Sequence, residues 1–219
     1  YMIEFFLICY NNSYMKPKYW NKGIKYLSNK DKVLKDLIKS YPKEYLSLNS
    51  NYFHSLTNSI IGQQISVSAA DSMKKKFFSL NRIITPNSVL KLKTSELRKC
   101  GLSRQKILYI KNIAIFFNNN KKFIKNISNY SEEDISNKLI EIKGVGPWTI
   151  HMFLMFSFGS PNIFPIGDLG FLNAICKNYK KKLPLNDREL IYLKNKWSPY
   201  CSQATWYLWR SLDPIPVNY

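Results

Sequence analysis

The stretch from Trp148 to Phe158, in which nearly every residue is apolar, restricts the fold of this 219-residue chain more than any other feature. A helix that is apolar on all sides cannot face water, so other elements of the fold must surround it. Gly-Val-Gly-Pro precedes the stretch, and Gly159, Pro161 and Pro165 follow it. We therefore expect a central buried helix bounded by two tight turns.

Elsewhere apolar residues recur mostly at the three- and four-residue spacing of helices, and no stretch keeps the two-residue alternation of strands. One apolar stripe is interrupted at Gly62 and resumes at Val67, so a break between helices falls at residues 62–65. Another stripe covers residues 107–117, and residues 118–126, NNNKKFIKN, are typical of a surface connection. These patterns predict an all-α fold.

Composition indicates a globular protein that carries a large positive charge. With 45% hydrophobic and 15% aromatic residues, the chain can bury one core or two small lobes that share one. The formal net charge of +19 would attract a polyanion such as nucleic acid. Lys far outnumbers Arg, and Asn and Ile are abundant, as an AT-rich genome would also produce. The charge alone therefore leaves both explanations open.

Four cysteines, Cys9, Cys100, Cys176 and Cys201, are scattered without a CxxC pair. This spacing suits neither zinc nor an iron–sulfur cluster, so we expect free thiols in a reducing compartment. The first ten residues are apolar but too short to span a membrane, and they lack the basic flank of a signal peptide. We expect a cytoplasmic protein with no membrane partner and with residues 1–14 as a variable tail.

Two helices are expected to meet at a glycine-rich hairpin. The first begins near Ser131, where SEED resembles a capping box, and the second begins at Pro147, a position that needs no N–H group. Gly144 and Gly146 between them allow a ligand to approach the backbone, and the N–H groups that begin a helix can bind phosphate. An ordinary turn with glycine as a C-cap is the alternative.

Asp168 lies just beyond the Gly/Pro-rich turn, immediately before another apolar stripe that starts at Leu169. This is the position of a helix N-cap, which alone would explain an aspartate there. A catalytic carboxylate is the second interpretation. His151 is the titratable residue of the apolar stretch, and we interpret it as a core residue rather than a catalyst.

Several segments in the same order resemble the helix-hairpin-helix (HhH-GPD) DNA glycosylase superfamily. LIEIKGVGPWTIHMFLMF followed by FPIGDLG resembles its hairpin and catalytic loop. IIGQQISVSAA, LRKCGLSRQKILYI and WYLWRSLD are similar to segments of the 3-methyladenine DNA glycosylase II type. The resemblance covers roughly residues 19 to 216. It includes no counterpart of the N-terminal β-rich domain that longer members carry, so we expect the compact, single-domain form.

This resemblance implies a two-lobed helical fold with the active-site cleft between the lobes. The glycosylase domain would cover residues 15–219, with the hairpin at 139–150 and the catalytic loop at 159–168. The implied partner is double-stranded DNA containing alkylated bases, bound by a monomer. No catalytic metal or cofactor is implied, although such hairpins commonly hold a structural monovalent cation on carbonyl oxygens.

The resemblance also assigns roles to residues that contact DNA. A damaged base must leave the stack before it can be attacked. The hairpin residues Lys143, Gly144, Val145 and Gly146 would hold phosphate through backbone N–H groups. Gln64 and Ile65, at the break between two helices, would enter the duplex in place of the flipped nucleotide.

The implied reaction is hydrolysis of the N-glycosidic bond to leave an abasic site in base excision repair. Positive charge develops on the sugar, and the carboxylate of Asp168 would stabilise it and orient water. Trp148 and Trp209 match positions where relatives present aromatic faces to a cationic base. Their alternative role is in the core, which is the role expected of Trp20, Trp197 and Trp206.

Trp148 also bears on the reaction type. Bifunctional members of the superfamily carry a Lys at this position, two residues past the second hairpin glycine, and the resemblance therefore implies a monofunctional enzyme. Two alternatives stay open, namely a helix-hairpin-helix module that binds DNA without chemistry and a glycosylase/lyase for oxidised or mismatched bases. Asp168 disfavours the first, and Trp148 disfavours the second.

Overall fold

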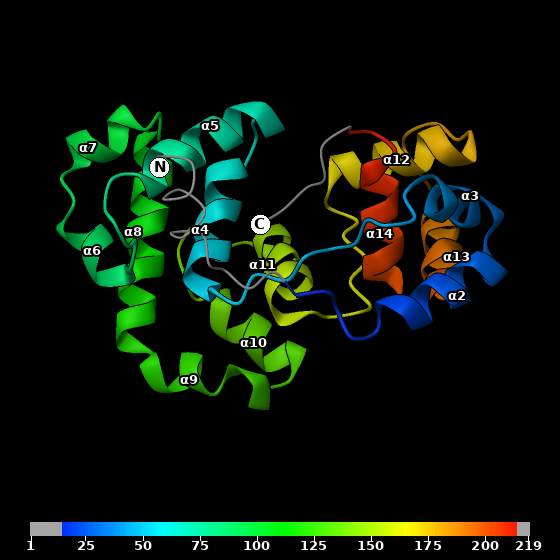
Figure 1. Ribbon diagram of the computed structural model, residues 1–219, viewed down its shortest axis with the longest axis horizontal. Coiled ribbons are helices and arrows are strands. Elements are labelled where there is room, and N and C mark those ends of the chain that lie inside the picture. Colours follow the sequence, from blue (N-terminus) through cyan, green and yellow to red (C-terminus); the bar gives the residue numbers. More distant parts are fainter. Residues whose placement is uncertain (1–14, 214–219) are drawn as a thin grey trace. The chain divides into compact units, whose positions relative to one another are not determined.

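The computed structural model describes residues 15–213, which fold into helices without any β-strand (Figure 1). One isolated bridge joins Met15 and Leu48. The predicted all-α fold is therefore confirmed. The expected N-terminal tail, residues 1–14 with Cys9, lies outside the described residues.

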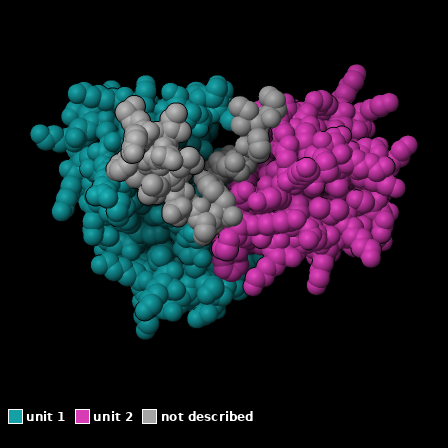
Figure 2. Space-filling view, in the orientation of Figure 1, with its two compact units in different colours: residues 1–13, 49–153, 219 teal, residues 14–48, 154–218 magenta. Residues whose placement is uncertain are grey.

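The described residues form two compact units, shown in different colours in Figure 2. Unit 1 contains Asn49–Phe153, and unit 2 contains residues 15–48 together with residues 154–213. The division agrees with the two lobes that the sequence predicts. Unit 2 is assembled from segments far apart in the chain, because α3 (Lys32–Ser40) and α2 (Trp20–Lys30) pack on α14 (Cys201–Arg210).

Unit 1 is built around α8 (Arg104–Asn119), which packs on α4 (Tyr52–Gly62) and α6 (Pro86–Lys91). Its core contains fully buried aliphatic side chains from α4 and α8, among them Leu56, Ile60, Ile110 and Ile113. The other helices of the unit are α5 (Val67–Phe78), α7 (Thr94–Lys99), α9 (Lys121–Lys125), the 3-10 helix η1 (Ile127–Asn129), α10 (Glu132–Leu139) and α11 (Pro147–Phe153).

Most helix boundaries in unit 1 follow the sequence signals. α4 ends at Gly62, and α5 is capped by Ser66, whose hydroxyl accepts a hydrogen bond from the backbone of Ala69. The expected capping box is present, since Ser131 and Asp134 bond reciprocally at the start of α10. The connection at residues 118–126 is not simply an irregular surface segment. It contains the short helix α9. Phe123 of this helix packs against Phe116 and Tyr130, so an otherwise polar segment makes apolar contacts with the rest of the unit.

Unit 2 surrounds α14, every residue of which is buried. The helices around it include α2 and α3, already given, and α12 (Leu169–Tyr179) and α13 (Asp187–Trp197). Trp20, Trp197 and Trp206 are at most 1% exposed, which confirms their expected place in the core. Because α14 is buried along its whole length, its side chains are held in place by the surrounding helices. Trp209 is one of these side chains.

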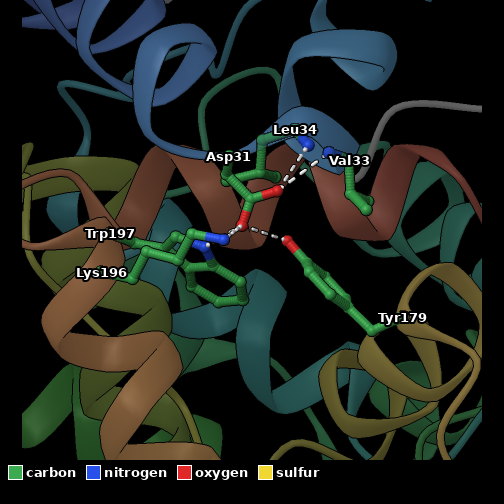
Figure 3. A network of polar contacts seen from close by, with 6 residues as sticks. All are labelled: Asp31, Val33, Leu34, Tyr179, Lys196 and Trp197. Atoms are coloured by element: carbon green, nitrogen blue, oxygen red, sulfur yellow. Dashed lines mark hydrogen bonds and ion pairs between the residues drawn. The ribbon is translucent and has the colours of Figure 1, made fainter.

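A buried carboxylate links three segments of unit 2 (Figure 3). Oδ1 of Asp31 caps α3 by accepting hydrogen bonds from the backbone of Val33 and Leu34. Its Oδ2 atom accepts hydrogen bonds from the Tyr179 hydroxyl and the Trp197 indole N–H. The same atom forms an ion pair with Lys196, whose Nζ lies 3.0 Å away. Figure 3 draws all of these residues together with Val33 and Leu34. One residue therefore joins α3 to α12 and α13.

The apolar stretch predicted as one buried helix is helical and largely buried. It begins at Pro147, as expected, but it is regular only as α11, and its last turn widens into the π-helical segment η2 (Leu154–Phe158). Gly159, with a φ of +80°, follows the stretch. No helix within residues 15–213 is long and apolar enough to cross a membrane.

Candidate functional site

Asp168 lies at the N-terminus of α12, after the loop that follows Gly159. Its Oδ1 atom accepts a hydrogen bond of 2.5 Å from the backbone N–H of Phe171, so the side chain caps the helix as the sequence predicts. The carboxylate is half-buried, whereas the residues around it, Ile166 and Leu169, are 56% and 63% exposed. An aspartate held in this way has a fixed orientation beside an accessible apolar surface.

Trp209 is brought to Asp168 by α14. Its indole N–H donates a hydrogen bond of 3.1 Å to Oδ1 of Asp168, the same oxygen that caps α12. The ring is 8% exposed and stacks on Phe156 with an interplanar angle of 15°. Trp209, predicted as an aromatic face, thus makes a polar contact that no local sequence pattern reveals.

Gly170 makes the contact between Asp168 and Trp209 sterically feasible. A Cβ atom at this position would lie 3.1 Å from Oδ1 of Asp168 and 3.8 Å from the Trp209 indole nitrogen. Such a distance is tighter than ordinary contact, so a side chain here would push on the carboxylate. Gly170 is therefore a residue of the candidate site that the sequence does not predict.

The loop before Asp168 is fixed to α14 by Ser202. The Ser202 hydroxyl donates to the carbonyl oxygen of Ser160 and accepts from the backbone N–H of Ile163. The backbone N–H of Ser202 donates to the carbonyl oxygen of Pro161. The backbone N–H of Asp168 itself donates to Pro165. One serine on the central helix thus holds the loop that presents the carboxylate.

The glycine hairpin lies in unit 1, between α10 and α11. Val145 is buried, and its N–H closes the turn on the carbonyl oxygen of Ile142 at 2.9 Å. Gly144 has a φ of +104°, and a Cβ atom there would lie 2.1 Å from the Tyr109 ring. A Cβ atom at Gly146 would have no atom within 4 Å. The two glycines therefore serve different purposes: Gly144 is required by the fold, and Gly146 leaves open space.

Helix α8 supports this hairpin from one side. The Asn112 amide donates a 3.1 Å hydrogen bond to the carbonyl oxygen of Lys143, and the Tyr109 ring lies against Gly144. The Lys143 side chain is exposed. Contacts between α8 and residues more than 30 positions away cannot be inferred from spacing, so Asn112 and Tyr109 are absent from the sequence prediction.

Gln64 and Ile65 lie in the turn between α4 and α5, as predicted. Both residues are exposed, and Gln64 has a φ of 57°, in the left-handed region that a residue with a Cβ atom seldom adopts. The preceding Gln63 side chain donates a hydrogen bond to Thr149 of α11, the neighbour of Trp148. The turn and the hairpin helix are therefore in direct contact within unit 1.

Trp148 is half-buried at the second position of α11, and His151 is half-buried on the same helix. Burial lowers the pKa of His151, which favours the neutral imidazole.

Among residues 15–213, the structure contains no group of three or more His, Cys, Asp or Glu residues arranged to hold a metal ion. Cys100, Cys176 and Cys201 are free thiols.

Within each unit, the structure brings together predicted residues that the sequence separates. In unit 2, Asp168 and Trp209 are hydrogen-bonded. In unit 1, the hairpin residues 143–146 lead into α11, whose second residue is Trp148, while Gln64 and Ile65 adjoin the same helix through Gln63. Two all-helical units with these segments define a helix-hairpin-helix protein.

The chain belongs to the HhH-GPD superfamily of base excision DNA repair proteins, whose family model matches residues 57–197. It is 31% identical over 180 residues to the Bacillus subtilis (strain 168) protein YfjP, covering 77% of this chain and 61% of that protein. It is 30% identical over 189 residues to the DNA-3-methyladenine glycosylase of Saccharomyces cerevisiae, covering 78% of this chain and 64% of the relative. The chain thus spans less than two thirds of the length of these two relatives.

A solved structure shares the fold. The Schizosaccharomyces pombe 3-methyladenine DNA glycosylase Mag1, in complex with abasic DNA, aligns with a TM-score of 0.77 at 25% sequence identity. The alignment covers 87% of this chain and 96% of Mag1. The fold therefore corresponds closely to that of a compact relative.

Proposed function

We propose that this protein is a monofunctional DNA glycosylase that removes alkylated purines of the 3-methyladenine type. The observation that carries the proposal is the carboxylate of Asp168, fixed by two donors on Oδ1 within a family of base excision repair proteins. Relatives named DNA-3-methyladenine glycosylase support the choice of substrate. Double-stranded DNA is the proposed partner, and the protein acts on it as a monomer.

In the proposed reaction the bond between C1′ of the sugar and the purine nitrogen breaks, and the base leaves with the bonding electron pair. The carboxylate of Asp168 stabilises the positive charge that develops on the sugar. Water adds to C1′ and loses its proton, which leaves an abasic site. Because alkylation makes the base cationic, it is already a good leaving group, and an aromatic face such as that of the half-buried Trp148 suits it. Trp209 is 8% exposed and stacked on Phe156, so it contributes through its hydrogen bond to Asp168.

The DNA contacts follow from the hairpin and the turn. Backbone N–H groups at Lys143, Gly144 and Gly146 hold a phosphate, and the open space at Gly146 supports a close approach of the DNA backbone. The N–H group of Val145, expected to hold phosphate as well, is instead bonded to the carbonyl oxygen of Ile142 within the turn. The exposure of Gln64 and Ile65 supports their entry into the duplex.

A monovalent cation on hairpin carbonyl oxygens is part of the same proposal. Replacing K⁺ and Na⁺ by tetramethylammonium at constant ionic strength should then weaken duplex binding.

Base release from methylated duplex DNA tests the function. The purified protein should release free methylated purines and leave strands that break only after alkali or an added endonuclease. Trp148 cannot form an imine with the sugar, so borohydride should trap no covalent adduct at the level of a bifunctional control. Duplex binding without base release would identify a non-catalytic DNA-binding module instead. Efficient trapping and strand cleavage would identify a glycosylase/lyase.

A further inference from the structure

The turn between α4 and α5 is held in a conformation that its sequence does not favour. Gln64 adopts a φ of 57°, where the Cβ atom crowds the following carbonyl oxygen. Residues kept in such a region persist only when surrounding contacts determine them. The unfavourable backbone conformation of Gln64 therefore indicates that contacts of the neighbouring residues hold this turn.

The first anchor is the Gln63 side chain. Its amide nitrogen donates a 3.1 Å hydrogen bond to the hydroxyl of Thr149, which is 1% exposed. Thr149 is the third residue of α11 and follows Trp148 directly. A hydrogen bond between a glutamine in a turn and a buried threonine in another helix fixes the distance between the two segments.

The second anchor comes from α8. The Lys106 ammonium group donates a 2.7 Å hydrogen bond to the carbonyl oxygen of Ile61, in the last turn of α4. A cation at this end of a helix also opposes the negative end of the helix dipole. The same helix α8 contacts the hairpin through Asn112 and Tyr109. Both DNA-contacting segments of unit 1 are thus attached to one helix.

We propose that Gln63 is a positioning residue, whose hydrogen bond to Thr149 joins the Gln64-Ile65 turn to the hairpin helix so that both engage DNA as one body. This inference rests on the proposed function, because it assigns a role within base flipping. Gln63 itself enters no step of bond breaking. When the hydrogen bond is lost, the turn no longer keeps a fixed position relative to the hairpin, and insertion into the duplex becomes less favourable.

The test uses a duplex that contains a tetrahydrofuran abasic-site analogue with 2-aminopurine opposite it. Insertion of the turn unstacks 2-aminopurine and raises its fluorescence, and no base has to be excised. Thr149→Val removes the acceptor while keeping the shape of the side chain. We expect the equilibrium constant for insertion to fall about five-fold, as the loss of one neutral hydrogen bond predicts, with affinity for undamaged duplex within two-fold of wild type. Insertion by Thr149→Val at the wild-type level would overturn the inference.

Thr57→Val is the matched control. Thr57 is also a fully buried threonine of unit 1, and its hydroxyl has no hydrogen-bond partner in the described structure. This variant should insert as wild type does. Thr149→Ser, which keeps the hydroxyl, should restore insertion. An equal loss in Thr57→Val and Thr149→Val would mean that general destabilisation causes the effect, and it would overturn the positioning role.

A double-mutant cycle separates the pair from its surroundings. Gln63→Leu and the double variant Gln63→Leu/Thr149→Val should each lose about as much insertion as Thr149→Val, because one hydrogen bond is removed in all three. Additive losses, about 25-fold in the double variant, would contradict the coupling. Failure of the wild-type protein to release methylated purines would overturn the proposed function, whereas the abasic-analogue assay addresses the positioning role separately.

Discussion

The indole N–H of Trp209 donates a hydrogen bond to Oδ1 of Asp168, with 3.1 Å between the two atoms. The backbone N–H of Phe171 donates to the same oxygen. Two donors on one oxygen restrict rotation of the carboxylate about its terminal torsion. The orientation of Asp168 is thus set by α14 and α12 together, and Trp209 acts on the carboxylate through its polar edge.

Trp209→Phe should slow base release at least about ten-fold, because a hydrogen bond to a charged group contributes roughly 1.5–3 kcal/mol. The phenyl ring keeps the contact with Phe156, so duplex affinity should change less than two-fold. Single-turnover excision of a methylated purine measures the rate. Trp206→Phe is the control on the same helix, since the Trp206 indole N–H is buried without a partner in the described structure. Equal rates in wild type and Trp209→Phe would refute a positioning contact.

Asp168→Asn should lower the excision rate by at least about 100-fold, because the variant lacks the charge that stabilises the transition state. The asparagine Oδ1 atom can still accept the hydrogen bonds from Phe171 and Trp209, and asparagine is as good an N-cap as aspartate. Affinity for undamaged duplex and the melting temperature should therefore stay close to wild type. Substantial excision by the folded variant would leave Asp168 with a capping role alone.

The hairpin glycines should respond differently to substitution. Gly146→Val should keep its melting temperature, because a Cβ atom there meets nothing within 4 Å, yet bind damaged and undamaged duplexes about ten-fold more weakly. Gly144→Ala should instead lower the melting temperature, because its Cβ atom would collide with Tyr109. Unchanged affinity of Gly146→Val for both duplexes would exclude a phosphate contact at this position.

Much of the fold can be predicted from the sequence because its signals are local. The Gly62 break, the Ser131 capping box, Pro147 at the first helical position and Asp168 as an N-cap each depend on residues within one helical turn. Such signals identify helix ends whatever the rest of the chain does. The buried tryptophans follow from the apolar pattern in the same way.

The contacts that give the candidate site its geometry cannot be predicted in this manner. Trp209 lies 41 positions from Asp168, and Thr149 lies 86 positions from Gln63. Their pairing depends on how α14 packs on α12 and how α11 packs on α4. From the sequence alone, Gly170 is an ordinary helical glycine, because the position of the Trp209 indole next to it depends on helix packing. The sequence does not predict α9, because residues 118–126 are mostly polar and the aromatic partners of Phe123, namely Phe116 and Tyr130, lie outside that segment.

The buried carboxylate of Asp31 makes the stability of unit 2 depend on pH. Burial by itself raises the pKa of Asp31, but hydrogen bonds from Lys196, Trp197 and Tyr179, with a further one from the Leu34 backbone, outweigh it and leave the pKa below its ordinary value of 3.8. Because the folded-state pKa is the lower one, the stabilisation is fully present above the unfolded-state pKa. It is lost as the pH falls through the folded-state pKa.

Asp31→Asn should therefore destabilise the protein by about 3 kcal/mol near pH 7, since it leaves the Lys196 ammonium group without its buried carboxylate. The difference from wild type should shrink as the pH falls below about 4, where the wild-type carboxylate begins to take up a proton. Urea unfolding followed at several pH values between 3 and 7 measures both effects. Asp36→Asn, at an exposed position on the same helix α3, is the matched control and should unfold near pH 7 as wild type does. A deficit in Asp31→Asn that stays constant down to pH 3 would mean that the Asp31 charge does not stabilise the fold and that its hydrogen bonds alone do.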